Sequence, residues 1–309
     1  YGVRVLDPTS VDWILNSLSP DPIQHYLGWE LFRRSPVHLP YIGANYNAVY
    51  PFRTSVLFTD SLPLAALFFK LLGGILPTRF QYFGWWGLLC YALQGGLAQA
   101  VIARIAGVQP TFGRDDKSKA AIAIIMSPGQ TAKLWGSVLG AGVLVLFPAL
   151  TIRMFAHTAL AANWLVLLAL YLWLRSDELM PTTRRACLIW GGMGLLCAGI
   201  HLYYLPMVGL VLVGYAVRRA LQKRGPAAVL APIAAFCAAA LAELVLLGAF
   251  AVNFAGYSNG YLSGADYFGL FVPWLAQSWE QNVYAGIGTS LAVVLAVFGI
   301  VCNARKAEK

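Results

Sequence analysis

Residues 20–36 read PDPIQHYLGWELFRRSP and contain the densest group of ionisable side chains in the sequence. The start of this stretch has the features of a helix N-terminus. Asp21 stands where an N-cap residue belongs, Pro22 suits the first helical position, and Gln24 completes a capping pattern. The stretch therefore predicts a helix that begins at its acidic end.

The apolar residues of this helix recur at a spacing that places them on one face, namely Ile23, Tyr26, Leu27 and Leu31. The rest of its surface carries the ionisable residues Asp21, His25, Glu30, Arg33 and Arg34. This arrangement is typical of a helix that lies on a membrane surface with its polar side in water. We expect an amphipathic surface helix that carries the chemistry of the protein.

The composition of the chain is that of a protein that crosses a membrane several times. Of its 309 residues, 59% are hydrophobic and 11% are charged, whereas soluble domains average about 25% charged residues. The formal net charge of +9 does not indicate nucleic-acid binding, because Lys and Arg in membrane proteins mainly report orientation. We therefore expect an all-α, polytopic membrane protein.

Seven segments are apolar and long enough to be predicted as transmembrane helices. They are residues 82–104, 134–152, 158–174, 186–203, 205–221, 227–251 and 284–304. Most Lys and Arg residues lie in alternate loops, so the positive-inside rule places those loops in the cytoplasm. The predicted organisation is a periplasmic region at 1–81, a six-span bundle at 82–252 with a cytoplasmic loop at 107–133, a periplasmic loop at 253–283, and a last span with a basic cytoplasmic tail at 284–309.

Residues 57–76 form a further apolar segment for which two placements are open. Asp60 and Lys70 lie within it, and a charge at the centre of a membrane-spanning helix costs about 2.5–3.5 kcal/mol. We favour a juxtamembrane or re-entrant helix that is capped by Thr59 or Asp60. The alternative is an eighth span, which would place residues 1–56 in the cytoplasm.

Acidic and histidine residues of the N-terminal region are candidates for catalysis. Asp21 and His25 are four positions apart, so a helix places their side chains next to each other. A carboxylate beside an imidazole suits general-base catalysis or one corner of a metal site. The structural alternative is that Asp21 and Asp60 cap helices and that Asp12 belongs to a turn.

Positive residues on the predicted outer face are candidates for binding phosphate. Arg33 and Arg34 could bind a phosphate through paired N–H groups, or could simply be solvated. Arg153 and His157 end the second predicted span at the outer face, where a positive charge opposes the orientation bias. His201 reaches the same face and has side-chain packing as its alternative role.

Two further features suggest a pathway and a sugar site. Glu243 lies in an Ala- and Leu-rich helix and must face the bundle interior or a cavity, because a charge in lipid is costly. Trp274 and Trp279 of the loop 253–283 could stack on sugar rings or form an aromatic belt at the membrane boundary. Asp266 of the same loop completes the predicted sugar- or acceptor-binding residues.

Several motifs resemble the GT-C superfamily of membrane glycosyltransferases, which use polyprenyl-phosphate sugars. Five segments are similar to a bacterial family of membrane proteins assigned to that fold. They are DPTSVDW, DPIQHYLGWELFRRSP, FTDSLPLAALFFKLL, FQYFGWWGLLCYALQGG and RMFAHTALAANWL. The similarity covers most of residues 1–215. Residues 107–133 depart from the family pattern. The family also has a membrane span before GVRVLDP, so we expect the sequence to be a fragment.

The resemblance implies a GT-C-like helical bundle with amphipathic helices on its outer face, and a catalytic acid in the first outer loop. That acid corresponds to Asp21, with Asp12 as the second candidate, and it would deprotonate the acceptor hydroxyl. The phosphate leaving group would need a divalent cation such as Mg²⁺ or Mn²⁺, or positive side chains, of which the candidates are Arg153, His157, Arg33, Arg34 and His201. No set of metal-ligating residues and no other cofactor is predicted.

The implied partners are a polyprenyl-phosphate-linked sugar donor, a glycan or lipid acceptor, and membrane lipids, without nucleic acid. The implied location is the bacterial inner membrane, with the active site facing the periplasm. Two other functions stay open. One is a transporter or flippase of lipid-linked sugars, in which Glu243 and the outer arginines would line the pathway. The other is a non-catalytic membrane subunit whose outer loops bind a partner.

Overall fold

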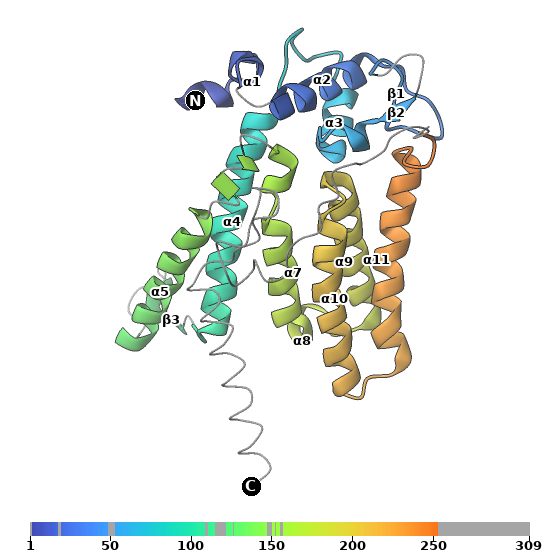
Figure 1. Cartoon of the computed structure of the whole chain (residues 1–309). Helices are drawn as coiled ribbons and strands as arrows, with labels where there is room; N and C mark the ends of the chain where they lie inside the picture. Colours follow the sequence, from blue (N-terminus) through green and yellow to red (C-terminus); the bar gives the residue numbers. More distant parts are fainter. Residues whose placement is uncertain are drawn as a thin grey trace, which may run out of the picture. The chain divides into compact units, whose positions relative to one another are not determined.

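The computed structural model of the chain describes residues 2–17, 20–48, 53–108, 111–114, 122–125, 127–146, 150–151, 153–154 and 157–252. These residues are mostly helical, which confirms the predicted helical class (Figure 1). The predicted loop at 253–283 and the predicted span at 284–304 lie outside the described residues.

The N-terminal region consists of short elements that lie across one end of the longer helices (Figure 1). They are η1 (Gly2–Leu6), α1 (Asp12–Leu15), α2 (Pro20–Arg34), β1 (Ala44–Asn45), β2 (Thr54–Ser55), η2 (Val56–Phe58) and α3 (Pro63–Leu71). β1 and β2 pair antiparallel, with Ala44 opposite Ser55.

The longer helices run side by side and form the bundle. They are α4 (Phe83–Ile105), α5 (Pro128–Val145), α7 (Trp164–Leu174), α9 (Thr183–Ile200), α10 (Tyr204–Leu221) and α11 (Pro226–Leu246), with η3 (Thr158–Ala161) and α8 (Ser176–Leu179) as short pieces between them. α9 packs closely on α11, and a Cβ at Gly194 would lie 2.4 Å from the carbonyl oxygen of Phe236. Small residues allow such close approach of two helices.

A short hairpin falls within the region that the sequence predicts as a cytoplasmic loop. β3 (Thr111–Arg114) and β4 (Ile122–Ile125) pair antiparallel, with Thr111 opposite Ile125. The isoleucines of β4 suit a strand, because β-branched side chains favour extended backbone.

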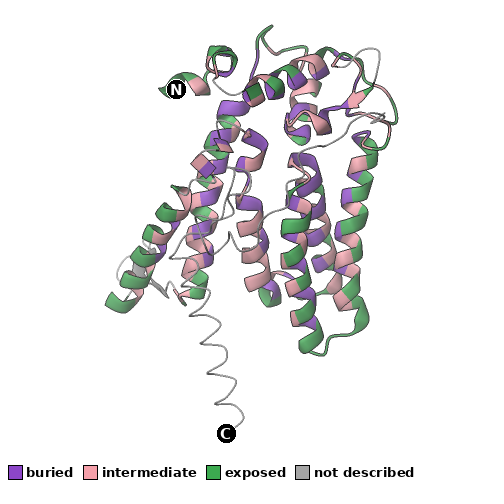
Figure 2. Ribbon diagram, in the orientation of Figure 1, coloured by how far each residue is buried: buried purple, intermediate pink, exposed green. Residues whose placement is uncertain are grey.

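Among the described residues, three helices, α4, α10 and α11, are long and apolar enough to cross a membrane, and residues 158–174 form a shorter apolar helical segment. Helices overlap each of the six predicted spans that precede residue 252. The outer faces of the three long helices carry exposed apolar side chains such as Leu88, Leu210 and Leu241 (Figure 2). An exposed apolar surface of this kind suits contact with lipid.

α3 is too short to cross a membrane by itself. It has 9 residues, which at about 1.5 Å per residue reach roughly half of the hydrocarbon thickness. Neither Thr59 nor Asp60 caps it, contrary to the prediction. Leu62 occupies the N-cap position, and its backbone is left-handed with a φ of 55°.

The far end of the bundle, opposite the N-terminal region, carries a group of ion pairs between charged side chains. Asp177 pairs with Arg218 and with Arg219, the latter at 2.8 Å. Glu178 pairs with Arg104 and Arg175 at 2.6 Å each. These pairs join the ends of α4, α7 and α10.

α2 buries Tyr26 of the predicted apolar stripe together with residues outside that stripe. His25, Trp29 and Phe32 are buried, whereas Leu27 is 46% exposed. Trp29 Nε1 donates to the carbonyl oxygen of Phe80 at 3.0 Å, just before α4. Contacts with neighbouring segments therefore decide which side of α2 is buried within the fold.

The β1–β2 hairpin attaches the N-terminal region to the end of α11. Ser55 Oγ donates to the carbonyl oxygen of Leu247 at 2.6 Å, and the Gly43 N–H donates to that of Leu246 at 3.4 Å. Carbonyls at a helix C-terminus lack partners within the helix. The hairpin therefore satisfies groups that α11 leaves free.

Lys70 links α3 to α2. Its Nζ donates to the carbonyl oxygen of Phe32 at 2.8 Å and lies 3.9 Å from the centre of the Phe32 ring. Burial lowers the pKa of Lys70 from 10.5 to about 8.

Gly28 allows α2 to approach the loop between η2 and α3. A Cβ at this position would lie 2.4 Å from Thr59 Cβ and 2.6 Å from Ser61 Oγ. Ser61 Oγ in turn donates to the carbonyl oxygen of His25 at 2.7 Å. A side chain at Gly28 would therefore push this loop away from α2.

The lowered pKa of Lys70 predicts a pH dependence of stability. The folded chain binds this proton less tightly than the unfolded chain, so the free energy of unfolding rises as pH rises from about 8 to 10.5. Lys70→Met removes this contribution. We expect the thermal midpoint of the wild type in detergent, relative to that of Lys70→Met, to rise over this pH range. A constant difference between the two midpoints would contradict the prediction.

Gly28→Ala should destabilise the protein by roughly 1–3 kcal/mol, because overpacking shifts the backbone. The matched control is Gly96→Ala in α4, where an added Cβ meets no atom within 4 Å among the described residues. This control should be neutral or slightly stabilising, since alanine favours a helix interior. Thermal unfolding of both variants measures the difference, and equal midpoints would show that the loop has room to move.

Candidate active site at the end of the helical bundle

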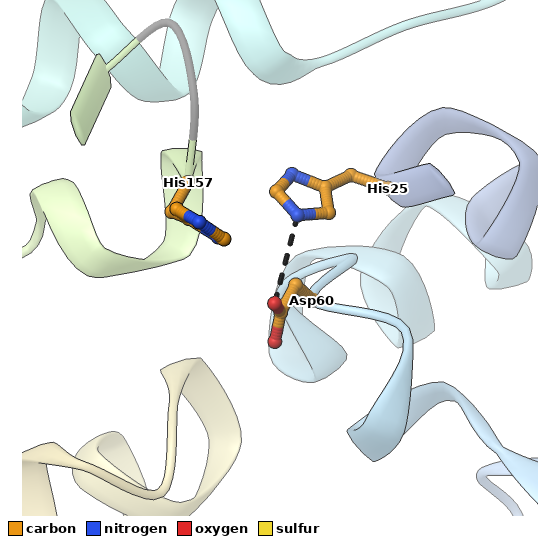
Figure 3. A group of neighbouring side chains, drawn as sticks. All are labelled: His25, Asp60 and His157. Atoms are coloured by element: carbon orange, nitrogen blue, oxygen red, sulfur yellow. Dashed lines mark ion pairs between the residues drawn. The ribbon is translucent and has the colours of Figure 1, made fainter. Parts of the chain in front are cut away.

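Five ionisable residues come together from segments that are far apart in the sequence. His25 lies on α2, Asp60 follows η2, and His157 directly precedes η3 (Figure 3). Asp21 lies in the first turn of α2, and His201 follows the last residue of α9. We call these five residues the polar cluster.

Asp60 is the centre of the polar cluster. Its Oδ1 lies 3.1 Å from His201 Nε2, and its Oδ2 lies 3.6 Å from His25 Nε2. The backbone of Asp60 has a φ of 51°, a left-handed conformation that Asp tolerates better than most residues. This backbone turns the carboxylate towards the two histidines instead of the start of α3.

The loop that carries Asp60 is anchored on two sides. Ser61 Oγ donates to α2 at the carbonyl oxygen of His25, and the hydroxyl of Tyr82 donates to the carbonyl oxygen of Ser61. Leu62 has a positive φ as well, and such a backbone costs about 1–3 kcal/mol in a residue other than glycine. The surrounding contacts hold the loop in this strained form, as is common at functional sites.

The protonation of His201 follows from its partners. The backbone N–H of Tyr203 donates to His201 Nδ1 at 3.2 Å, so Nδ1 is the acceptor of the neutral ring. Nε2 then carries the proton and donates to Asp60 Oδ1. His201 therefore orients the Asp60 carboxylate as a neutral hydrogen-bond donor.

His25 is the most buried member of the polar cluster, with 1% exposure. Its Nδ1 lies 3.2 Å from Thr158 Oγ1, which leaves Nε2 facing Asp60. The carbonyl oxygen of Thr158 accepts from Trp86 Nε1 at 2.9 Å. His25 thus connects α2, the Asp60 loop and η3.

Asp21 and His157 form the accessible pair of the cluster. Asp21 Oδ2 lies 3.0 Å from His157 Nε2, and the side chains are 31% and 25% exposed. α2 begins at Pro20, so Asp21 lies inside the first turn and not at the predicted N-cap position. The rings of His25 and His157 lie 5.9 Å apart, which joins this pair to the Asp60 contacts.

The surroundings of the cluster shift two pKa values downwards. Burial is the largest cause that lowers the pKa of His157, and nearby His25 and Arg153 lower it further, against the opposing effect of Asp21. Burial alone would raise the pKa of Asp60, but its contacts with His201 and His25 outweigh this effect and lower it. At neutral pH, Asp60 is therefore a carboxylate and His157 a neutral imidazole.

This arrangement can perform two kinds of chemistry. An accessible carboxylate beside a neutral imidazole can accept a proton from a bound hydroxyl group. In addition, one ligand atom each of His25, Asp60 and His157 lies within 4.8 Å of the others, so these three side chains could hold a metal ion (Figure 3).

An apolar cavity of about 230 Å³ lies close to this end of the bundle. It is lined by residues of η1, by the first half of α4 and by Met154. Met154 directly follows Arg153, three positions before His157. The cavity therefore reaches the segment that carries both positive candidates.

The other predicted site residues lie elsewhere. Arg33 donates to the backbone carbonyls of residues 76–78, the shortest contact being 2.7 Å to Pro77, and Arg34 pairs with Glu30. These contacts give Arg33 a structural role in the connection between α3 and α4. Asp12 is exposed in the first turn of α1 and is not a member of the polar cluster.

Trp274, Trp279 and Asp266 lie outside the described residues, so their predicted role in sugar or acceptor binding stays a prediction.

Sequence reasoning missed Thr158 as a partner of His25, and it missed that Asp60 and His201 touch. Thr158 is adjacent to His157 in the sequence, which is the one signal that could have indicated it. No spacing relates Asp60 to His201, because the loop before α3 and the end of α9 meet only in the folded chain.

The comparisons with known proteins identify a family. No curated protein and no solved structure matches the chain. One family matches residues 1–309, and its description is "Domain of unknown function (DUF6311)". The chain belongs to the DUF6311 family.

Proposed function

We propose that the protein is a membrane-bound glycosyltransferase that moves a sugar from a polyprenyl-phosphate donor to an acceptor hydroxyl, with Asp21 as general base. One observation carries this proposal. The partly exposed Asp21 carboxylate lies 3.0 Å from His157, in the same cluster as Asp60, whose two oxygens contact His201 and His25.

The exposure of Asp21 supports its role as the base. A base must come within hydrogen-bond distance of the proton that it removes, and 31% of the Asp21 side chain is accessible. Neutral His157 donates to the carboxylate and so orients it at the accessible edge of the cluster. Asp60 is less suitable as the base, because two histidines already contact its two oxygens.

The surroundings of His157 support binding of a lipid-linked phosphate. Arg153 lies close enough to His157 to affect its pKa, so a positive charge lies beside the cluster. Met154 lines the apolar cavity next to α4. A polyprenyl phosphate could therefore place its anionic group near Arg153 and part of its apolar chain against α4.

The reaction then balances without another reagent. The acceptor oxygen attacks the anomeric carbon of the sugar while Asp21 takes its proton. The bond between the anomeric carbon and the phosphate oxygen breaks, and its electron pair leaves with the polyprenyl phosphate. Positive groups near the phosphate stabilise the negative charge that develops there.

The distribution of charge supports a periplasmic site in a multi-span protein of the bacterial inner membrane. Arg104 of α4, Arg218 of α10 and Arg175, which directly follows α7, lie at the end of the bundle opposite the polar cluster. By the positive-inside rule that end faces the cytoplasm, so the cluster faces the other side. The helical bundle with surface helices at this end agrees with the GT-C-like architecture that the sequence resemblance implies.

Asp21→Asn tests the role of the base. We expect transfer from a polyprenyl-phosphate sugar to fall by about 10²–10⁴-fold, since this is the usual contribution of a general base, while donor binding changes little. Asp7→Asn is the matched control, because Asp7 is exposed, contacts the nearby turn residues Thr9 and Ser10 through its side chain, and is not a member of the polar cluster. Full transfer activity in Asp21→Asn would contradict the proposal.

A second candidate function is transport of lipid-linked sugars across the membrane, and Glu243 favours it. Glu243 on α11 is 7% exposed, and its Oε2 has no hydrogen-bond partner among the described residues. An unsatisfied buried carboxylate in an apolar helix is costly and is typical of a transport pathway.

Transport predicts the opposite pattern of mutant effects. Glu243→Gln should abolish movement of a fluorescent polyprenyl-phosphate sugar between the leaflets of proteoliposomes, whereas Asp21→Asn should retain it. A glycosyltransferase should instead lose transfer in Asp21→Asn and keep most of it in Glu243→Gln. Measuring transfer and leaflet movement with the same donor separates the two functions.

A further inference from the structure

We infer that His25, Asp60 and His157 form a binding site for a divalent transition-metal ion of the zinc class. Their ligand atoms lie within 4.8 Å of one another and come from three segments of the fold (Figure 3). Two imidazoles and one carboxylate form a ligand set that binds Zn²⁺ and related ions, in contrast to the all-oxygen sets that Mg²⁺ prefers.

The contact between His25 and Asp60 fits a shared metal ion better than a hydrogen bond. Their closest ligand atoms are 3.6 Å apart, which is beyond the usual hydrogen-bond distance of about 2.7–3.2 Å. Two ligands of a tetrahedral zinc ion, each about 2.0–2.1 Å from it, lie roughly 3.4 Å apart. His25 and Asp60 have nearly this separation, and the ligand atom of His157 lies within 4.8 Å of theirs.

Each of the three ligands has a second partner that orients it. Thr158 Oγ1 contacts His25 Nδ1 at 3.2 Å, and His201 Nε2 contacts Asp60 Oδ1 at 3.1 Å. The carboxylate of Asp21 contacts His157 at 3.0 Å. Hydrogen bonds from outside the ligand set are characteristic of metal sites, because they fix the ring orientation and the tautomer of the ligands.

The burial of His25 is the independent observation that points to a ligand. Its side chain is almost fully buried, and its Nε2 faces Asp60 at 3.6 Å, a longer separation than a hydrogen bond. A metal ion between His25 and Asp60 would give Nε2 a close partner in this buried position.

Three protein ligands would leave a coordination position open. Catalytic zinc sites have this composition and use the open position for water or substrate. If the proposed transfer reaction holds, the open position would accept an oxygen of the donor phosphate. This role rests on the proposed function, whereas binding of the ion depends on the three side chains alone.

The test is binding of Zn²⁺ alone to the 309-residue chain, purified in detergent with an affinity tag that contains no histidine. After metal removal, we expect about one tightly bound Zn²⁺ per chain by mass spectrometry of the metal and by calorimetric titration. Asp60→Asn and His157→Ala should weaken binding by more than about 100-fold. His201→Ala should weaken it by about 10–100-fold, as expected of a residue that orients a ligand.

His38→Ala is the matched control. His38 stacks on Tyr46 and is the remaining one of the four histidines, so this variant should bind Zn²⁺ like the wild type. His157→Ala guards against misfolding as an explanation, because His157 is partly exposed. Its circular dichroism spectrum and metal-free thermal midpoint should match those of the wild type.

Two results would overturn the inference. One is a wild-type chain that binds no Zn²⁺, and the other is equal affinity in the wild type, Asp60→Asn and His157→Ala. Co²⁺ as a spectroscopic probe adds a check, since a thiolate charge-transfer band would show that cysteine binds the ion instead. A chain that binds zinc but transfers no sugar would overturn only the proposed function. A chain that binds no zinc but still transfers sugar would overturn only the metal site.

Discussion

The contact of buried His25 with the loop that carries Asp60 is the constraint on which this end of the protein depends. A histidine with 1% exposure must have partners for both ring nitrogens, since an unpaired buried polar group is costly. Thr158 faces one nitrogen and Asp60 the other. Ser61 also binds the backbone of His25. Together these contacts connect α2, the Asp60 loop and η3, and they place the remaining members of the cluster around them.

The two carboxylates of the cluster have different environments, and this difference separates their roles. Asp60 is held by two histidines and by a strained, anchored loop, so it is suited to a fixed position. Asp21 is 31% exposed and has His157, itself partly exposed, as a partner. Pairs of acids in unlike environments are a common way to combine a fixed electrostatic group with a proton acceptor.

The two ends of the bundle also differ in their chemistry. The polar cluster contains histidines and carboxylates that are partly or fully buried. The opposite end contains more exposed pairs of arginine with Asp177 and Glu178. Between these ends, α4, α10 and α11 expose apolar side chains over lengths that can cross a membrane. A protein built in this way can hold a polar site at one membrane surface while its basic residues stay at the other.

The sequence by itself determined the helical class, the apolar helices α4, α10 and α11, and the presence of Asp21 and His25 on one helix. These features depend on local composition and on spacing along the chain, which a sequence displays directly. Only the tertiary structure decided that α2 buries His25 and Trp29 while Leu27 stays exposed, and that Arg33 binds backbone carbonyls. It also decided that Asp60, His157 and His201 share one cluster. These contacts join loops and helix ends that are distant in sequence, and their geometry depends on how the whole bundle packs.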